Sequence, residues 1–196
     1  MIKKLQKLKA KKGFTLVELI VVIAIIGVLA AILVPTMLGY VQNSRVTAAD
    51  QVAKTIKDAA QTVCTEMDTL GMGLADPASP VYVTGNVTKS GNSVTVTVDT
   101  LPGALTFKGL NAGSAGSKFQ EKLKTTLETL LTEAKTGTFR IGLDSGTCIA
   151  AYWSEDTSLS SSASLDSTGT PAWVPTTPGV LNDGSIVGSA PKYTGA

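Results

Sequence analysis

The first 70 residues contain two different hydrophobic patterns. Between residues 19 and 34, sixteen consecutive residues carry no polar side chain. With residues 14–17 and 36–41 on either side, this run is longer than the ~20 residues that cross a bilayer as a helix. Six lysines lie within the first 13 residues, ahead of the run. Because lysine-rich flanks stay in the cytoplasm, we expect one membrane-spanning helix, with the lysine-rich segment inside and the C-terminal part of the chain outside.

The second pattern begins after this run and is amphipathic. Apolar residues recur at spacings of three and four, at Val46, Ala49, Ala53, Ile56, Ala60, Val63, Met67 and Leu70. This periodicity predicts that the same helix continues to residue 70, where Gly71 and Gly73 end it. Residues 14–70 would then form a helix about 85 Å long. Three alanines make the apolar stripe thin, which favours packing on a sheet over a two-stranded coiled coil.

The middle of the chain contains two hairpin patterns with a helical pattern between them. Residues 81–88 and 94–98 are rich in β-branched residues and flank the turn sequence Ser90-Gly91-Asn92. Residues 138–143 and 147–153 flank a second turn, Asp144-Ser145-Gly146. Between the hairpins, residues 118–135 have apolar residues on one helical face, and Gly137 follows as a stop.

The last 43 residues, 154–196, are biased in composition. Of these residues, 24 are Ser, Thr, Gly or Pro, which is typical of an irregular, flexible tail. Six apolar residues could instead hold part of the segment over the sheet: Trp173, Val174, Val180, Leu181, Ile186 and Val187. Both interpretations are open at this point.

Composition and charge exclude several classes of function. The chain has no His, so a Ser-His-Asp or Cys-His nucleophile and a His-ligated metal are excluded. Its net charge of +2 comes from the N-terminal lysines, and beyond residue 13 there are 11 basic against 15 acidic residues. We therefore expect no general binding of nucleic acid. The acids Glu155, Asp156, Asp166 and Asp183 could supply oxygen ligands for Ca²⁺, but they lack EF-hand spacing, so solvated surface carboxylates are favoured and we expect no metal site. We also expect no cofactor and no enzymatic activity.

Glu18 does not fit a plain membrane anchor. A carboxylate within a membrane span costs roughly 2.5–3.5 kcal/mol and usually faces a partner, yet no Lys or Arg lies between Lys12 and Arg45. A cut between Gly13 and Phe14 would create an α-amine four residues before Glu18, on the same helical face. That amine could pair with the carboxylate within one chain or between neighbours. A secretory signal peptide is the competing interpretation, but its apolar region is usually about 7–15 residues long.

Residues 11–18, Lys-Lys-Gly-Phe-Thr-Leu-Val-Glu, together with the apolar run and Pro35, carry a resemblance. This segment resembles the class III signal and N-terminal helix of type IV pilins and the related pseudopilins of type II secretion. The resemblance covers residues 1–40. It implies that a prepilin peptidase removes residues 1–13 by cutting after Gly13, and that Phe14 is then N-methylated.

The resemblance also implies a fold and a division of the chain. The fold would be an α+β lollipop, in which a long N-terminal helix packs on a four-stranded antiparallel sheet with an inserted helix and an irregular C-terminal region. Residues 1–13 would be the leader, 14–41 the transmembrane and assembly half of the helix, 42–153 the globular head, and 154–196 the C-terminal region. Glu18 and Phe14 would dock subunits, and Pro35 would mark a bend or partial melting of the helix.

The function implied is that of a structural subunit, most simply a major pilin. Such a protein first resides in the cytoplasmic membrane as a single-pass precursor. It then polymerises into an extracellular filament for adhesion, motility or aggregation. Its partners would be copies of itself, the prepilin peptidase and the assembly machinery, and the sequence identifies no surface receptor. Two alternatives stay open: a type II secretion pseudopilin or competence pilin, and a membrane-anchored binding domain that never polymerises.

The two cysteines are far apart in sequence but are expected to meet. Cys64 lies on the predicted helix, and Cys148 lies in a strand that should cover it. Outside the membrane a disulfide between them would join the helix to the sheet. Many type IV pilins place both cysteines near the C-terminus, so this spacing departs from that pattern. Two buried free thiols are the alternative.

Overall fold

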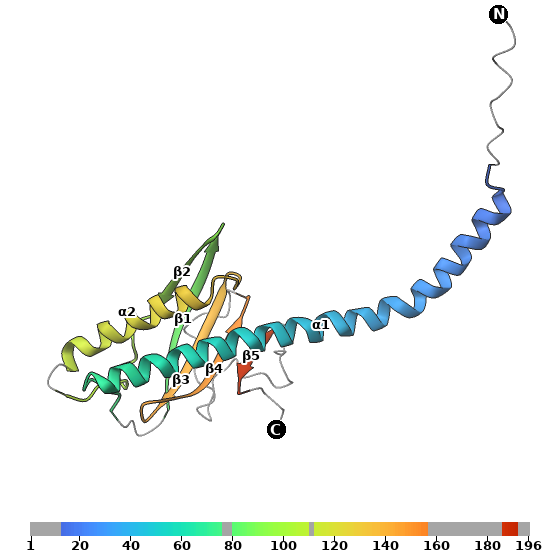
Figure 1. Ribbon diagram of the computed structural model, residues 1–196. Coiled ribbons are helices and arrows are strands. Elements are labelled where there is room, and N and C mark those ends of the chain that lie inside the picture. Colours follow the sequence, from blue (N-terminus) through green and yellow to red (C-terminus); the bar gives the residue numbers. More distant parts are fainter. Residues whose placement is uncertain (1–12, 76–79, 110–111, 157–185, 192–196) are drawn as a thin grey trace, which may run out of the picture. The chain divides into compact units, whose positions relative to one another are not determined.

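The computed structural model describes residues 13–75, 80–109, 112–156 and 186–191. Its elements follow the chain in the order shown in Figure 1. They are α1 (Leu16–Thr69), β1 (Val81–Ser90), β2 (Ser93–Val98), α2 (Ala112–Leu130), β3 (Gly137–Asp144), β4 (Thr147–Ser154) and β5 (Val187–Ala190).

Helix α1 confirms the long helix expected from the two hydrophobic patterns. It runs through Pro35 without a break and ends at Thr69, two residues before Gly71, whose φ of 70° is typical of a glycine that terminates a helix. The structure divides into two compact units, with the boundary between Asn43 and Ser44. We refer to residues 16–41 as the apolar half of α1 and to residues 44–69 as its amphipathic half.

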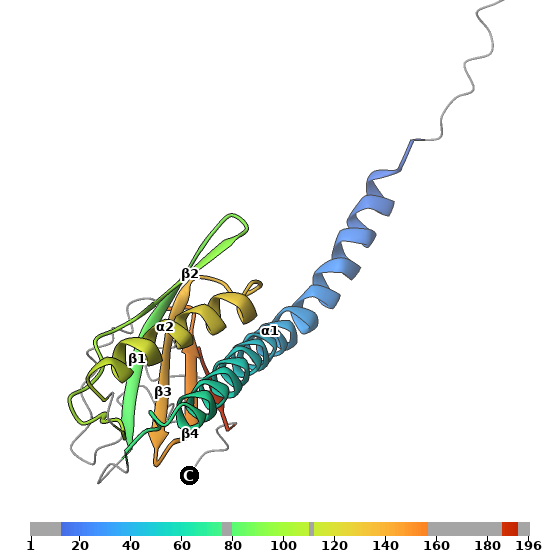
Figure 2. The ribbon, with the colours of Figure 1, turned by 60° about the vertical axis from the view of Figure 1, so that its left-hand side comes forward.

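The strands form one antiparallel sheet in the order β2-β1-β3-β4-β5. Both predicted hairpins are confirmed, as β1-β2 and β3-β4. The expected count of four strands is wrong, because β5 pairs with β4 as a fifth strand (Figure 2). This strand comes from the C-terminal region, for which an irregular tail and a segment held over the sheet were both open, and residues 187–190 follow the second interpretation. All four of its residues are buried, and the backbone of Gly188 lies so close to Ala49 of α1 that a side chain would collide with it.

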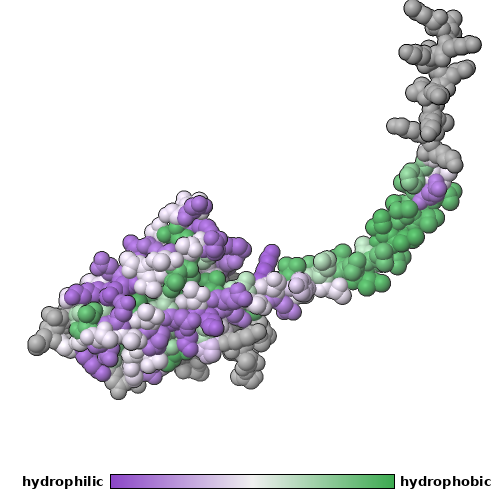
Figure 3. Space-filling view, viewed as in Figure 1, coloured by the Kyte–Doolittle hydropathy of each residue, from purple (hydrophilic) through white to green (hydrophobic). Residues whose placement is uncertain are grey.

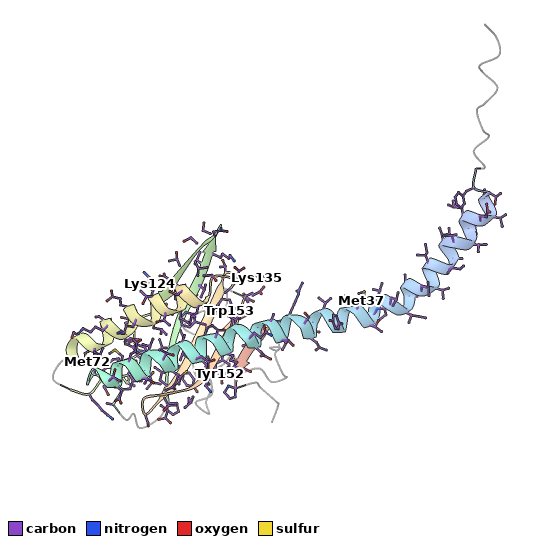
Figure 4. The ribbon with its side chains drawn as sticks, viewed as in Figure 1. Met37, Met72, Lys124, Lys135, Tyr152 and Trp153 are labelled. Atoms are coloured by element: carbon purple, nitrogen blue, oxygen red, sulfur yellow. The ribbon has the colours of Figure 1, made fainter. Side chains whose placement is uncertain are left out.

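The core lies between the sheet and the two helices, which cover the same face of it (Figures 1 and 2). Trp153 of β4 is fully enclosed on this side of the sheet (Figure 4). The predicted stripe of α1 is buried from Ala49 to Met67, whereas Leu70 is 54% exposed. Leu70 therefore does not belong to the stripe, because α1 has already ended at Thr69.

Helix α2 lies earlier in the sequence than the pattern predicted. It spans Ala112–Leu130 instead of residues 118–135. Its first turns are rich in Gly and Ser, which lowers helix propensity, but Ala115 is fully buried there. Leu131 and Ala134 have left the helix and are still buried where the chain turns into β3.

Helix α2 also protects an edge of the sheet. The carboxylate of Glu128 accepts a hydrogen bond from the backbone N–H of Val96 on the edge strand β2, at 2.9 Å. An edge strand with free N–H groups invites pairing with another chain, and this contact occupies one of them.

The opposite face of the sheet is polar and partly buried. The Thr84 hydroxyl donates to Asp99 at 2.6 Å, and the Arg140 guanidinium lies 4.9 Å from the centre of the Tyr82 ring. Burial lowers the pKa of Arg140 below its usual value.

Part of the C-terminal region lies outside the described residues, including Asp166, Trp173, Val174, Val180, Leu181 and Asp183. Ile186 packs against the core, and Val187 is fully buried. Within the described ranges, no three His, Cys, Asp or Glu residues form a cluster that could hold a metal ion.

Candidate processing and assembly site

The expected cleavage site lies just before α1. Gly13 and Phe14 are not helical, and Phe14 is 85% exposed. A side chain added at Gly13 would meet no described atom within 4 Å, and the φ of this residue is not positive. The fold of the described chain therefore does not require glycine at this position. A requirement for Gly13 would have to come from a protein that binds this segment.

Glu18 and Thr15 form reciprocal hydrogen bonds at the start of α1. The backbone N–H of Thr15 donates to the Glu18 carboxylate at 2.8 Å, and the Thr15 hydroxyl donates to the same oxygen at 2.8 Å. In return, the backbone N–H of Glu18 donates to the Thr15 hydroxyl at 3.2 Å. Thr15 is the N-cap and Glu18 the third helical residue, so this arrangement is a capping box.

The capping box gives Glu18 a partner that the sequence analysis missed. Its signal was visible as Thr-x-x-Glu directly before an apolar run. A carboxylate at this end of a helix is also stabilised by the helix dipole. The expected pairing with the Phe14 α-amine stays a prediction, because the Phe14 nitrogen is a peptide group in the uncut chain.

The apolar half of α1 has no packing partner within the described residues. Every residue from 13 to 45 is exposed, and Ile25, Leu29 and Ile32 are 55%, 54% and 65% exposed. Figure 3 shows apolar surface along this part of the helix. By length and composition, α1 is apolar enough to cross a membrane.

Pro35 interrupts the hydrogen bonding of α1 without ending the helix. Its ring removes one backbone donor, so one carbonyl of the preceding turn loses its helical partner. The Thr36 hydroxyl donates to the Leu33 carbonyl at 2.9 Å beside this point. The expected bend or melting at Pro35 remains a prediction.

The two cysteines both belong to the second unit. Cys64 of α1 and Cys148 of β4 are both buried and both carry free thiols in the structure. The expected disulfide between them thus remains a proposal, to which we return below.

Known proteins resemble this chain over part of its length. The family described as "Prokaryotic N-terminal methylation motif" matches residues 8–34. Fimbrial protein EcpC of Eikenella corrodens is 32% identical over 115 residues, which cover 56% of this chain and 75% of EcpC. The type IV major alpha-pilin of Moraxella bovis is 50% identical over 56 residues, 27% of this chain and 35% of that pilin.

A fimbrial protein of Pseudomonas aeruginosa is 41% identical over 73 residues, which are 37% of this chain. The chain spans 45% of the length of that relative, slightly less than half. No solved structure matches the chain.

The matched methylation motif contains Gly13, Phe14 and Glu18, the residues of the site described above. The match to EcpC is much longer than the motif and covers three quarters of that fimbrial protein. Together with helix α1, whose amphipathic half packs on an antiparallel sheet, these findings show that the chain belongs to the type IV pilin family, whose members are structural proteins and not enzymes.

Proposed function

We propose that this chain is a prepilin, the precursor of a major pilin that polymerises through α1 into an extracellular filament used for adhesion, motility or aggregation. The observation that carries the proposal is the apolar half of α1, a helix apolar on all sides whose residues are all exposed in the single chain. An exposed apolar surface of this size needs lipid or other protein to cover it. Lipid covers it in the precursor, and neighbouring subunits cover it in the filament.

The processing steps follow from the segment before α1. A prepilin peptidase cuts the exposed bond after Gly13, and the new N-terminal Phe14 is methylated. The precursor sits in the cytoplasmic membrane with its lysine-rich leader inside and its head outside. Membrane lipid, the peptidase, the assembly machinery and further copies of the chain are thus the proposed partners.

Glu18 acts in two successive states in this proposal. Before assembly, the capping box satisfies its carboxylate within the same chain, at 2.8 Å from the Thr15 N–H and hydroxyl. During assembly, the carboxylate pairs with the Phe14 α-amine of a neighbour and so sets the axial register of the subunits. Within lipid, apolar side chains alone give little preference for one axial register of the subunits. A charge pair gives a strong preference, because an unpaired charge there is costly.

Two variants of Glu18 separate capping from charge pairing. Glu18→Ala removes both functions, whereas Glu18→Gln keeps an oxygen that can accept the capping hydrogen bonds but carries no charge. Both variants should be cut and inserted like the wild type, and both should reduce the yield of sheared surface filaments at least tenfold. Filaments at wild-type yield from Glu18→Gln would show that capping suffices and would refute the charge-pairing step.

The wider proposal is tested on the wild-type protein. N-terminal sequencing and intact mass of the surface fraction should give a chain that begins with methylated Phe14. A mature chain that begins at Met1 would overturn the prepilin proposal in favour of an ordinary anchor. A chain that begins beyond the small residues Ala30-Ala31 would overturn it in favour of a cleaved signal peptide. Secretion or transformation defects without surface filaments would favour a pseudopilin or competence pilin.

A further inference from the structure

The amphipathic half of α1 and strand β4 each bury one cysteine in the same core. Cys64 and Cys148 are both only 2% exposed, and both belong to the apolar cluster between α1 and the sheet. They are 84 positions apart in the sequence, so only the fold brings their elements together.

A hydrogen bond fixes where Cys148 meets α1. The backbone N–H of Cys148 donates to the side-chain oxygen of Gln61 at 2.8 Å. Gln61 is one turn before Cys64, and helical side chains point back towards the N-terminus. The Cys64 thiol is therefore directed towards the turn of α1 at which Cys148 is anchored.

The strand register directs Cys148 towards the same place. Cys148 pairs with Leu143 of β3, and paired residues of neighbouring strands share a face of the sheet. Leu143 is 1% exposed and faces the core under α1. The side chain of Cys148 thus enters the core from the sheet side, as that of Cys64 enters it from the helix side.

Both thiols are shielded from water in this core, and this shielding governs their reactivity. Burial raises the pKa of Cys148 to about 12, with the Cys64 thiolate as the next cause, and burial raises the pKa of Cys64 to about 11. At neutral pH few molecules would therefore carry either thiolate, which is the reactive form. The packed dithiol therefore reacts slowly with oxidants.

We propose that Cys64 and Cys148 form an intrachain disulfide that closes while the head folds outside the membrane and is then shielded by the packing of α1 on β4. The outside location rests on the proposed function. The closed bond would tie the helix that carries the assembly segment to the middle of the sheet.

The oxidation needs a disulfide-containing thiol oxidase or a small disulfide as oxidant. One cysteine loses its proton, and its thiolate attacks the oxidant's disulfide, which gives a mixed disulfide and releases one thiol. The second cysteine, likewise deprotonated, attacks the sulfur of the first and releases the oxidant's other thiol. Two electrons pass to the oxidant, and the two protons lost by the cysteines end on its two thiols. Since both cysteines must be accessible as thiolates, the reaction precedes final packing.

The test uses the full chain isolated from its native membrane and surface fractions. The chain is denatured and treated with a thiol-reactive polyethylene glycol maleimide, with and without prior reduction by dithiothreitol. The expected result is no addition without reduction and two additions after it, with an intact mass about 2 Da lower before reduction than after, from the two hydrogens lost on closure. Two additions without reduction would overturn the disulfide.

Pairing and shielding are tested separately. Single variants Cys64→Ser and Cys148→Ser should each expose one reactive thiol under denaturation, and non-reducing electrophoresis should show a monomer for the wild type. A disulfide-linked wild-type dimer would refute the intrachain pairing. In the native protein, reduction by dithiothreitol should be at least tenfold slower than in urea, and equal rates would refute the shielding.

The same samples distinguish this proposal from the prepilin proposal. The N-terminus and the filament yield are measured alongside thiol labelling. Free thiols in filaments that begin at Phe14 would overturn only the disulfide. A disulfide in a chain that begins at Met1 would overturn only the processing and assembly.

Discussion

The two halves of α1 belong to one helix but carry opposite patterns. In the apolar half nearly every residue is apolar and every residue is exposed, whereas in the amphipathic half apolar residues recur every three or four positions and are buried. The amphipathic half obtains its burial from the sheet and α2 of its own chain. The apolar half must obtain it from lipid or from other chains.

This difference explains which residues each half can use. Against a sheet, Ala49, Ala53 and Ala60 let the helix approach the strands closely, and all three are buried. In lipid, close approach is not needed, and large side chains such as Ile25 and Leu29 are suitable all around the helix. If the apolar half lies in lipid, as proposed, the helical state is also enforced differently: by tertiary packing in the amphipathic half and by the lack of water for backbone groups in the apolar half.

The largest effect should come from a charge placed in the apolar half, compared with the same charge placed in the amphipathic half. Ile25→Lys introduces an unpaired charge where lipid or neighbouring subunits must cover the helix, at a cost of roughly 3 kcal/mol per subunit. The remaining apolar residues should still insert the helix, but filament yield should fall at least tenfold. The matched control, Gln51→Lys, adds the same charge at an exposed position of the amphipathic half and should change little. Equal filament yields would remove the distinction between the halves.

Truncating an isoleucine should destabilise the head only when that isoleucine lies in the amphipathic half of α1. Ile56 is fully buried, and Ile32 is 65% exposed. Ile56→Ala should lower the free energy of unfolding of the head by about 2–5 kcal/mol, because it removes packed methyl groups and leaves a cavity. Ile32→Ala should leave that free energy unchanged. Urea unfolding of the full chain in detergent, followed by tryptophan fluorescence, measures both, and similar losses would contradict the comparison.

Glycine-to-alanine substitutions should show the same contrast with a smaller effect. An added methyl group at Gly188 collides with the backbone of Ala49, whereas at Gly39 it meets no described atom within 4 Å. Gly188→Ala should destabilise the head by about 1–3 kcal/mol, because β5 must move away from α1. Gly39→Ala should be neutral or should stabilise the helix by up to ~1 kcal/mol. The same unfolding experiment measures both variants. An unchanged free energy of unfolding for Gly188→Ala would show that β5 does not pack closely against α1.

The sequence predicted those elements whose pattern is local. Helix α1 and the two hairpins have clear periodicity and clear turn residues, and their bounds differ from expectation by about two residues or fewer. Strand β5 was missed because Val-Gly-Ser-Ala has no alternation of its own. Its strand conformation comes from pairing with β4 and from the close approach of Gly188 to α1, which are contacts between residues far apart in sequence.

The candidate site shows the same limit. The segment around Gly13, Phe14 and Glu18 was identified from the sequence because its motif is contiguous. The capping hydrogen bonds between Thr15 and Glu18 were overlooked, although their spacing is a known helix-start signal. For Cys64 and Cys148 the sequence could place the residues on a helix and a strand, but the shared burial and the Gln61 contact required the fold.

The smallest effect should come from removing the ion pair that lies beside the buried stripe of the amphipathic half. Lys122 of α2 lies 2.6 Å from the carboxylate of Glu66 on α1, and the side chains of both residues are about 40–50% exposed. In water such a pair contributes little, since solvent screens it and ordering two long side chains costs entropy. A double-mutant cycle with Lys122→Ala and Glu66→Ala should give a coupling energy below about 1 kcal/mol, decreasing further in 1 M salt. If the buried stripe holds α1 to the head, losing the pair leaves that attachment intact. A coupling energy as large as the loss for Ile56→Ala would instead mean that charge pairs on its flank hold this half of the helix in place.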